Sequence, residues 1–240
     1  MRKKINTAKK TAQPAYVLPK GKALVLRTCD AKLRSYNGFQ WPKSGPVECP
    51  DWSPEVRCGN GLHGLLWGEG CGGLLSFEPN SVWLVVEIDP ATAVDLDGKI
   101  KFPRGVVVFV GNRNSAPQFL SEHGGHGRSI VSGTATAGDS GTATAGYSGT
   151  ATAGYSGTAT AGYRGTATAG DRGTATAGDR GTATAGYSGT AKSGKIGIVV
   201  LRWYDNDRDR YRLAVGYVGE DGIEPNTFYR CDDAGKLVKA

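Results

Sequence analysis

Long apolar runs are missing from this sequence of 240 residues. No segment approaches the roughly 18 consecutive apolar residues that a membrane-spanning helix needs. No apolar stretch follows the basic start, as one would in a secretory signal. The sequence therefore predicts neither membrane insertion nor secretion, and we expect a cytoplasmic protein without a membrane partner.

Acidic residues are also missing from the start of the chain, where seven basic residues lie within residues 1–22. These account for the whole formal charge of +7, so the remainder is electrically balanced and its charge predicts no particular partner. The basic composition, with Ala, Thr and Pro, predicts a disordered tail over residues 1–22. We expect contact with nucleic acid only through this tail, if at all.

Regular cysteine spacing is absent. The odd number of cysteines favours reduced thiols over a disulfide framework; the five are Cys29, Cys49, Cys58, Cys71 and Cys231. Zinc prefers ligands of the types found at Cys49, Cys58, His63 and Cys71, but their intervals of eight, four and seven residues match none of the usual zinc knuckles. We therefore expect free thiols and no metal at these four positions, and no cofactor elsewhere.

What the sequence does contain is one octad repeated with little change. Seven full copies of Gly-Thr-Ala-Thr-Ala-Gly, each followed by two variable residues, begin at Gly133, and a degenerate copy begins at Gly189. Thr and Ala alternate with period two, which is typical of a strand. Gly138 and the residues after it predict a corner, because glycine tolerates positive φ and Asp or Ser can bond its own backbone.

A single octad strand has only alanine methyl groups to bury, so the copies must stack on one another to fold. Stacking at about 4.8 Å with paired backbones predicts a β-solenoid, and two octads per coil are expected because eight residues barely close a loop. Alanine then fills the interior and the variable pair lies in the turns. Threonine rows lie on both outer faces, at Thr134, Thr136, Thr142, Thr144, Thr150, Thr152, Thr158, Thr160, Thr166, Thr168, Thr174, Thr176, Thr182 and Thr184.

The octad resembles a known repeat. Ala145–Thr152, Ala-Gly-Tyr-Ser-Gly-Thr-Ala-Thr, is similar to the Ala-Gly-Tyr-Gly-Ser-Thr-Gln-Thr octamer of bacterial ice nucleation proteins, and the resemblance covers about Gly133–Gly194. It implies a β-solenoid whose threonine rows order water and whose tyrosine ladders pair solenoids. The array is short and departs from that octamer at several positions, so efficient ice nucleation does not follow. The sequence favours a role as a structural spacer or assembly surface over a role as a surface that orders water or ice.

Tyrosine takes the first variable position in four octads. Its ring offers broad contact area at low entropic cost. We predict that the four rings form one association strip for a weak homo-oligomer or a protein partner, with solvated turn residues as the alternative. The strip comprises Tyr147, Tyr155, Tyr163 and Tyr187.

Two flanks bracket the repeat. Short apolar runs such as Val82–Asp89 and Gly105–Gly111 predict buried strands before it, and Ile196–Tyr204 predicts one after it. The fold class is mainly β: after the tail come a small α+β domain at 23–120, a capped solenoid at 121–195 and a β-meander at 196–240. The flanks resemble uncharacterised bacteriophage domains, which implies a bacterial host cell if the protein is phage-encoded.

An enzyme in residues 23–120 is the competing hypothesis. An Arg on an early strand, a His in a Gly-rich turn and an acid late on a strand resemble small ADP-ribosyltransferase-like folds. The resemblance implies that Arg27 and His63 hold a dinucleotide and that Glu87 polarises a ribose hydroxyl. A domain that binds a nucleotide without catalysis is the other version of this hypothesis. The sequence favours instead a non-catalytic structural or binding module that presents a repetitive Thr/Tyr surface.

Overall fold

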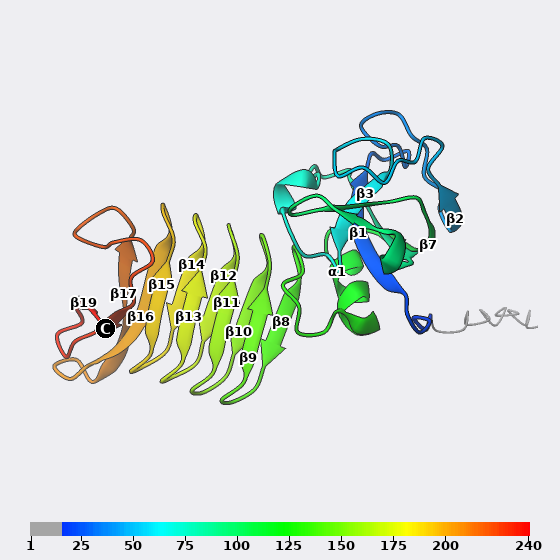
Figure 1. Ribbon diagram of the computed structural model, residues 1–240. Helices are drawn as coiled ribbons and strands as arrows, with labels where there is room; N and C mark the ends of the chain where they lie inside the picture. The colour runs from blue at the N-terminus through cyan, green and yellow to red at the C-terminus, as the bar shows by residue number, and fades with distance from the viewer. Residues whose placement is uncertain (1–15) are drawn as a thin grey trace, which may run out of the picture.

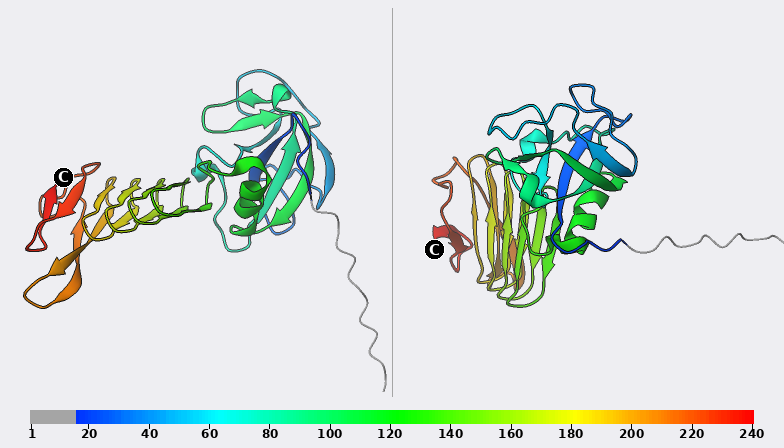
Figure 2. Two further views of the ribbon diagram at one scale, coloured as in Figure 1. Left: turned by 90° about the horizontal axis from the view of Figure 1, so that it is seen from below. Right: turned by 45° about the vertical axis from the view of Figure 1, so that its right-hand side comes forward.

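The computed structural model describes residues 16–240. It arranges them as a sheet-based N-terminal domain, a stack of narrow coils and a C-terminal group of antiparallel strands (Figure 1). Seen from below, the coils form a thin ladder that projects from the broader N-terminal domain (Figure 2). Most of the predicted basic tail, residues 1–15, lies outside the described residues.

The N-terminal domain is built on one seven-stranded antiparallel sheet, in the order β2-β7-β4-β1-β3-β6-β5. β1 lies at its centre and pairs along its whole length with β4. The apolar runs of the sequence become its long strands. β1 and β4 are largely buried, as predicted, whereas Val107 is the one buried residue of β7. The strands are β1 (Ala23–Cys29), β2 (Gly45–Glu48), β3 (Leu62–Leu66), β4 (Val82–Ile88), β5 (Val94–Asp95), β6 (Ile100–Phe102) and β7 (Arg104–Gly111).

Both faces of this sheet are covered. Val25 and Leu84 belong to the apolar cluster on one face, whereas Leu26 and Val85 belong to the cluster on the other face, under α1 (Ser115–Leu120). Short helical turns complete the predicted α+β domain, namely the 3₁₀ turns η1 (Gly72–Leu74) and η2 (Pro90–Thr92) and the π turn η3 (Ser121–Gly125). Within residues 16–240, no helix is long and apolar enough to span a membrane.

The predicted β-solenoid with two octads per coil is confirmed. Successive octad strands alternate between two sheets, and each pairs in parallel with the strand one coil further on, so Thr150 lies between Thr134 and Thr166. The inward alanines, such as Ala151 and Ala167, are fully buried. The strands are β8 (Thr134–Ala137), β9 (Thr142–Ala145), β10 (Thr150–Ala153), β11 (Thr158–Ala161), β12 (Thr166–Ala169), β13 (Thr174–Ala177), β14 (Thr182–Ala185) and β15 (Thr190–Ser193).

The corner of each octad differs from the prediction. Positive φ falls on the eighth residue, as at Ser156 (φ 53°) and Arg164 (φ 54°), and not on the glycines before or after it. Glycine is needed there for close packing instead. A Cβ at Gly157 would lie 2.8 Å from the Cβ of Ala153, and a Cβ at Gly170 would lie 2.8 Å from the backbone of Gly154.

A ninth octad strand continues the solenoid beyond the degenerate copy. β16 (Ile198–Asp205) pairs in parallel with β14 and places Val199 and Leu201 in the alanine positions. From the sequence alone this segment belongs to the predicted meander, because Ile, Val and Leu replace Thr and Ala. Antiparallel strands then close both sheets at this end, namely β17 (Arg210–Tyr217) on β16 and β18 (Tyr229–Cys231) on β15, with β19 (Leu237–Lys239) beside β18.

Candidate functional surface and pockets

Threonine forms a regular lattice on each outer face of the solenoid. All of the predicted threonines point outward, with exposed or half-buried side chains. On the sheet that contains β8, the rows are Thr134, Thr150, Thr166, Thr182 and Thr136, Thr152, Thr168, Thr184. On the sheet that contains β9, the rows are Thr142, Thr158, Thr174 and Thr144, Thr160, Thr176.

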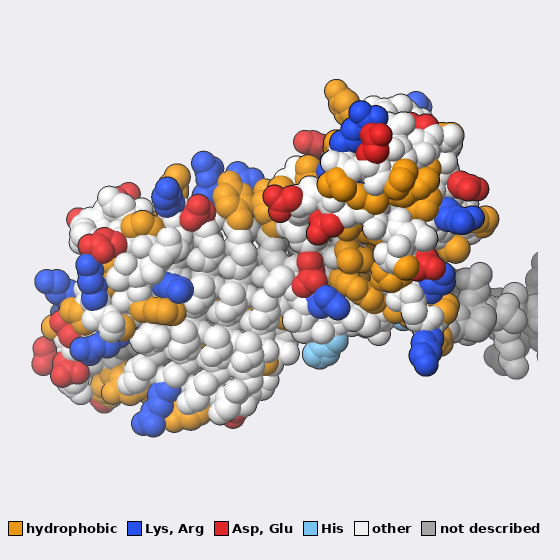
Figure 3. All heavy atoms as spheres, viewed as in Figure 1, with side chains coloured by type: hydrophobic (Ala, Val, Ile, Leu, Met, Phe, Trp, Pro, Cys, Tyr) orange, Lys and Arg blue, Asp and Glu red, His pale blue; other side chains and the backbone are white. Residues whose placement is uncertain are grey.

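On the face that Figure 3 shows, the surface over the central coils is free of charged side chains. Neighbouring threonines within a row lie one strand spacing apart, about 4.8 Å. A β-branched side chain has few rotamers, so hydroxyl and methyl groups recur at fixed intervals along the row. The hydroxyl oxygens of Thr174 and Thr190 are 3.4 Å apart. The regular pattern ends at the last coil, where Lys192 takes a threonine position and lies over the ring of Phe228.

The four tyrosines of the predicted association strip lie on two opposite edges. Tyr147 and Tyr163 follow β9 and β11, whereas Tyr155 and Tyr187 follow β10 and β14. The ring of Tyr147 also packs against the N-terminal domain, with its centroid 5.5 Å from that of the Phe77 ring. The structure therefore divides these residues into two pairs rather than one continuous strip.

Aspartate at the same variable position links neighbouring coils. Asp139 Oδ1 accepts a hydrogen bond from the backbone N–H of Tyr155 at 2.9 Å, and Asp179 Oδ1 accepts one from Lys195 at 2.8 Å. Asp171 bonds the next coil in the same way and also pairs with Arg202 of β16. Aspartate thus gives these coils a bond that the ring of tyrosine does not supply.

Arg27, His63 and Glu87 do not converge. Arg27 and His63 line one pocket, where Arg27 Nη1 donates to the backbone oxygen of His63 at 3.2 Å. Glu87 lies opposite Leu24, on the other face of the sheet from Arg27, because side chains alternate along paired strands. The arrangement implied by the ADP-ribosyltransferase-like resemblance is therefore not formed.

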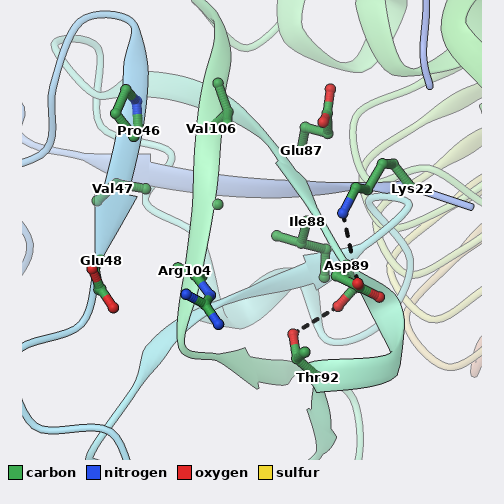
Figure 4. Close-up of a pocket in the computed structure, with 11 residues that line it drawn as sticks. Lys22, Pro46, Val47, Glu48, Glu87, Ile88, Asp89, Thr92, Arg104 and Val106 are labelled. Carbon is green, nitrogen blue, oxygen red and sulfur yellow. Dashed lines mark hydrogen bonds and ion pairs between the residues drawn. The ribbon is translucent and has the colours of Figure 1, made fainter.

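Glu87 lines a separate pocket of about 580 Å³ at the edge of the sheet (Figure 4). Its carboxylate accepts a hydrogen bond from the hydroxyl of Tyr16 at 2.7 Å, and burial together with this bond raises the pKa of Tyr16. Two cations, Lys22 and Arg104, face three carboxylates there, since Glu48 and Asp89 also line the pocket. Lys22 pairs with Asp89 at 3.6 Å, so positive charge in this pocket is compensated.

The four candidate zinc ligands are not assembled either. Cys49, Cys58 and His63 line the same pocket as Arg27, but Cys71 is absent from it. Cys49 donates to the carboxylate of Asp51 at 2.9 Å, while Lys99 Nζ donates to Cys58 Sγ at 2.8 Å. In the part of the chain that the structure describes, no group of three His, Cys, Asp or Glu side chains is arranged to hold a metal.

Comparisons with known proteins separate the two halves of the chain. Residues 23–122 match a family described as a domain of unknown function (DUF7666). Ice nucleation protein InaU of Pantoea ananas is 43% identical over 104 residues, and the ice nucleation protein of Xanthomonas campestris pv. translucens is 44% identical over 102 residues, each match covering 42% of this chain. That of Pseudomonas syringae pv. syringae is 43% identical over 117 residues, which are 48% of this chain. The repeat region is homologous to ice nucleation proteins.

The chain spans only a small part of these ice nucleation proteins, namely 10%, 6% and 10% of their respective lengths. Each match is longer than the octad array, so the similarity extends beyond Gly133–Gly194. No solved structure matches this chain. The resemblance that Ala145–Thr152 predicts is therefore confirmed for the ice nucleation repeat, and the domain that precedes it matches a family of unknown function.

Proposed function

We propose that this protein is a non-catalytic module whose solenoid presents two flat threonine lattices that order water against their surfaces. The observation that carries the proposal is the in-register stacking of Thr-Ala-Thr strands. Thr150 and Thr152 recur one coil later as Thr166 and Thr168, which pair with them in register. The solenoid and its homologues fit a non-catalytic repeat module.

The chemistry of the lattice suits water. Each hydroxyl both donates and accepts hydrogen bonds, and each methyl group leaves its neighbouring water free to bond elsewhere. A water held at one threonine therefore has an equivalent partner one strand spacing further along the same row. The buried alanine interior holds the rows in place, and the central coils carry no charge on this face that would bind its own hydration shell.

The size of the lattice limits what it can do. Proteins named for ice nucleation are homologous to this repeat region, but the present chain spans a tenth of their length or less. A patch of ordered water this small is a poor template for a growing crystal. We therefore expect adsorption to existing ice and only a slight effect on the freezing temperature of supercooled water.

Partition of the purified full chain into slowly grown ice tests the proposal. Thr150→Lys combined with Thr166→Lys places two charges at the centre of one lattice and should reduce partition. Ser140→Lys combined with Ser156→Lys adds the same charge in the turns, at the octad position that Arg172 already occupies, and should leave partition unchanged. Circular dichroism checks that both variants fold.

Equal partition of the lattice variant and the natural chain would remove the lattice of β8, β10, β12 and β14 from the proposal. Association through the exposed tyrosines, as a weak homo-oligomer or with another protein, belongs to the same proposal, because it is a further use of the presented surface. A bacteriophage setting, a cytoplasmic location and nucleic-acid contact through the basic tail stay predictions from the sequence.

A further inference from the structure

We propose that the pocket beside Arg27 binds a small phosphate ester, through a cationic floor and an aromatic wall. The pocket has a volume of about 720 Å³, which is larger than a phosphate group alone requires. Its lining residues come from β1, from β3 and from the loops before β2, β3 and β6, and they include Arg27, Ser35, Tyr36, His63 and Lys99.

Arg27 is the first observation that points to an anion. Its guanidinium stacks on the ring of Trp41 at 3.9 Å and donates to the backbone oxygens of His63 and Thr28 and to the hydroxyl of Ser35. All of these acceptors are uncharged, and the buried Nε has no partner in residues 16–240. A buried charge without a counter-ion is strongly unfavourable, so an anion in the adjoining pocket would stabilise it.

A second buried cation, Lys101, lies on the strand next to that of His63. Lys101 is fully buried, and its Nζ donates to the backbone oxygen of Arg57 at 3.0 Å. Lys101 stands opposite His63 across the β3–β6 pair, two residues from Lys99 at the pocket wall. The one carboxylate among the lining residues is Asp51, which accepts from the thiol of Cys49. Positive charge therefore exceeds negative charge around this pocket.

Two titratable groups in the pocket respond to this positive field. Burial and the charges of Lys99, Arg27 and Lys101 lower the pKa of His63. The hydrogen bond from Lys99, with the charges of Lys99 and Lys101, lowers the pKa of Cys58. Both shifts have the direction expected where positive charge is uncompensated. The Glu87 pocket, with its three carboxylates, supplies a matched contrast on the same domain.

The wall of the pocket indicates the rest of the ligand. Tyr36 is fully exposed and Phe39 lies beside it along the pocket, so flat apolar rings stand next to the cationic floor. Aromatic rings bind planar apolar groups through their faces. A phosphate monoester with an aromatic body satisfies both parts, with phosphate toward Lys99 and Arg27 and the body toward Tyr36.

Inorganic phosphate and phenyl phosphate are the probes for this site. The full chain carrying Cys71→Ser leaves Cys58 as the exposed thiol of the domain, and its alkylation by iodoacetamide at neutral pH reports its thiolate fraction. A bound phosphate raises the pKa of Cys58, so each probe should slow alkylation, by about threefold or more at saturation. The imidazole of His63, followed by NMR, should titrate at higher pH when either probe is bound.

Calorimetry with matched variants then locates the site. Lys99→Gln, at the pocket wall, should weaken phenyl phosphate binding by about tenfold, whereas Arg104→Gln in the Glu87 pocket should leave it unchanged. Phenyl phosphate should bind more tightly than inorganic phosphate, and Tyr36→Ala should abolish that difference. No change of Cys58 or His63 with either probe, equal effects of the two charge variants, or equal affinity for both probes would each overturn the proposal.

Discussion

The rings of Tyr147 and Tyr163 stack one coil apart, with centroids 5.1 Å apart and 26° between their planes. Tyr147 also packs on Phe77, and a Cβ at Gly72 would collide with its ring. The stack therefore continues an aromatic cluster of the N-terminal domain onto the edge of the solenoid. This contact joins the two parts of the molecule at the turn where the first coil ends.

Tyr147→Ala should loosen this junction. The ring is half-buried between Phe77 and Tyr163, so its loss should lower the free energy of unfolding by about 2 kcal/mol. Tyr155→Ala is the matched control, since that ring is 47% exposed and should contribute within about 0.5 kcal/mol. Urea unfolding measures both. Equal losses for the two variants would mean that the junction does not depend on this ring.

The loss of stability caused by deleting octads should depend on whether an even or an odd number is removed, because successive octads alternate between two sheets. Removal of 149–164 takes out one coil and keeps every later strand in its sheet, so the protein should fold with moderately lower stability. Removal of 149–156 moves every later strand to the other sheet and misplaces the C-terminal strands against both. Thermal unfolding followed by circular dichroism should therefore show the shorter deletion to be the more damaging one.

Ile196 should be replaceable with a gain in stability. It is a β-branched residue in the left-handed region, with φ 56°, and its side chain is 70% exposed, so it packs little. Ile196→Asn should raise the free energy of unfolding by about 1 kcal/mol. The reciprocal change, Ser156→Ile at φ 53°, should lower it by a similar amount. A loss of stability in Ile196→Asn, measured from the urea midpoint, would contradict this account of the corner.

Acid should weaken the C-terminal hairpin through Asp205. Burial would raise the pKa of this carboxyl, but hydrogen bonds from Arg212 and Arg208 lower it below its ordinary value of 3.8. A folded pKa below the unfolded one means that the stabilisation is complete above the ordinary value and is lost as the pH falls through the folded one. Asp205→Asn should make the free energy of unfolding depend less on pH in the acid range. Asp207→Asn, in the same turn, is the control and should leave that dependence unchanged, because Asp207 makes no ion pair within residues 16–240.

Association should depend on the edge that carries Tyr155 and Tyr187. These two rings are 47% and 41% exposed. Changing both to Asp, which the octad already accepts at Asp171, should leave circular dichroism unchanged and abolish concentration-dependent association in sedimentation. Tyr163→Asp, on the opposite edge, is the control. Association that survives in the double variant would direct attention to the threonine faces, and a natural chain that is monomeric at every concentration would end the hypothesis.

The octad region is readable from sequence because all of its determining contacts are local and repeated. Alternation of Thr and Ala gives the faces, and the small size of Ala gives the narrow coil. The sequence predicts a strand directly after the degenerate octad, and β16 does pair with the last coil. It assigns that strand to the meander rather than to a ninth octad, although Gly197 keeps the period of Gly189, because Val199 and Leu201 change the composition of the repeat. The sequence does not predict the geometry of the corner, because glycine can serve either positive φ or close packing. Only the short distances between coils show that close packing is the reason for glycine at these positions.

The N-terminal pocket could not be predicted in the same way. Its residues meet because β1 lies between β4 and β3, and no local pattern encodes that order of strands. The sequence did single out Arg27 and His63, which do share a pocket, but it grouped them with Glu87, which the alternation of β4 places on the other face. The burial of Lys101 had no sequence signal at all, because Lys between Ile100 and Phe102 reads as an exposed strand position.

The in-register pairing of each octad with the one a coil earlier has a consequence for biosynthesis. A new strand needs only a partner that has already left the ribosome, so the coils can add one at a time onto the finished N-terminal domain, with Ile130 and Val131 as the starting surface. Until Arg210–Tyr217 has been synthesised, each addition leaves a fresh open edge. The sheet of β8 to β16 is therefore covered at its open end only after the closing hairpin has been made.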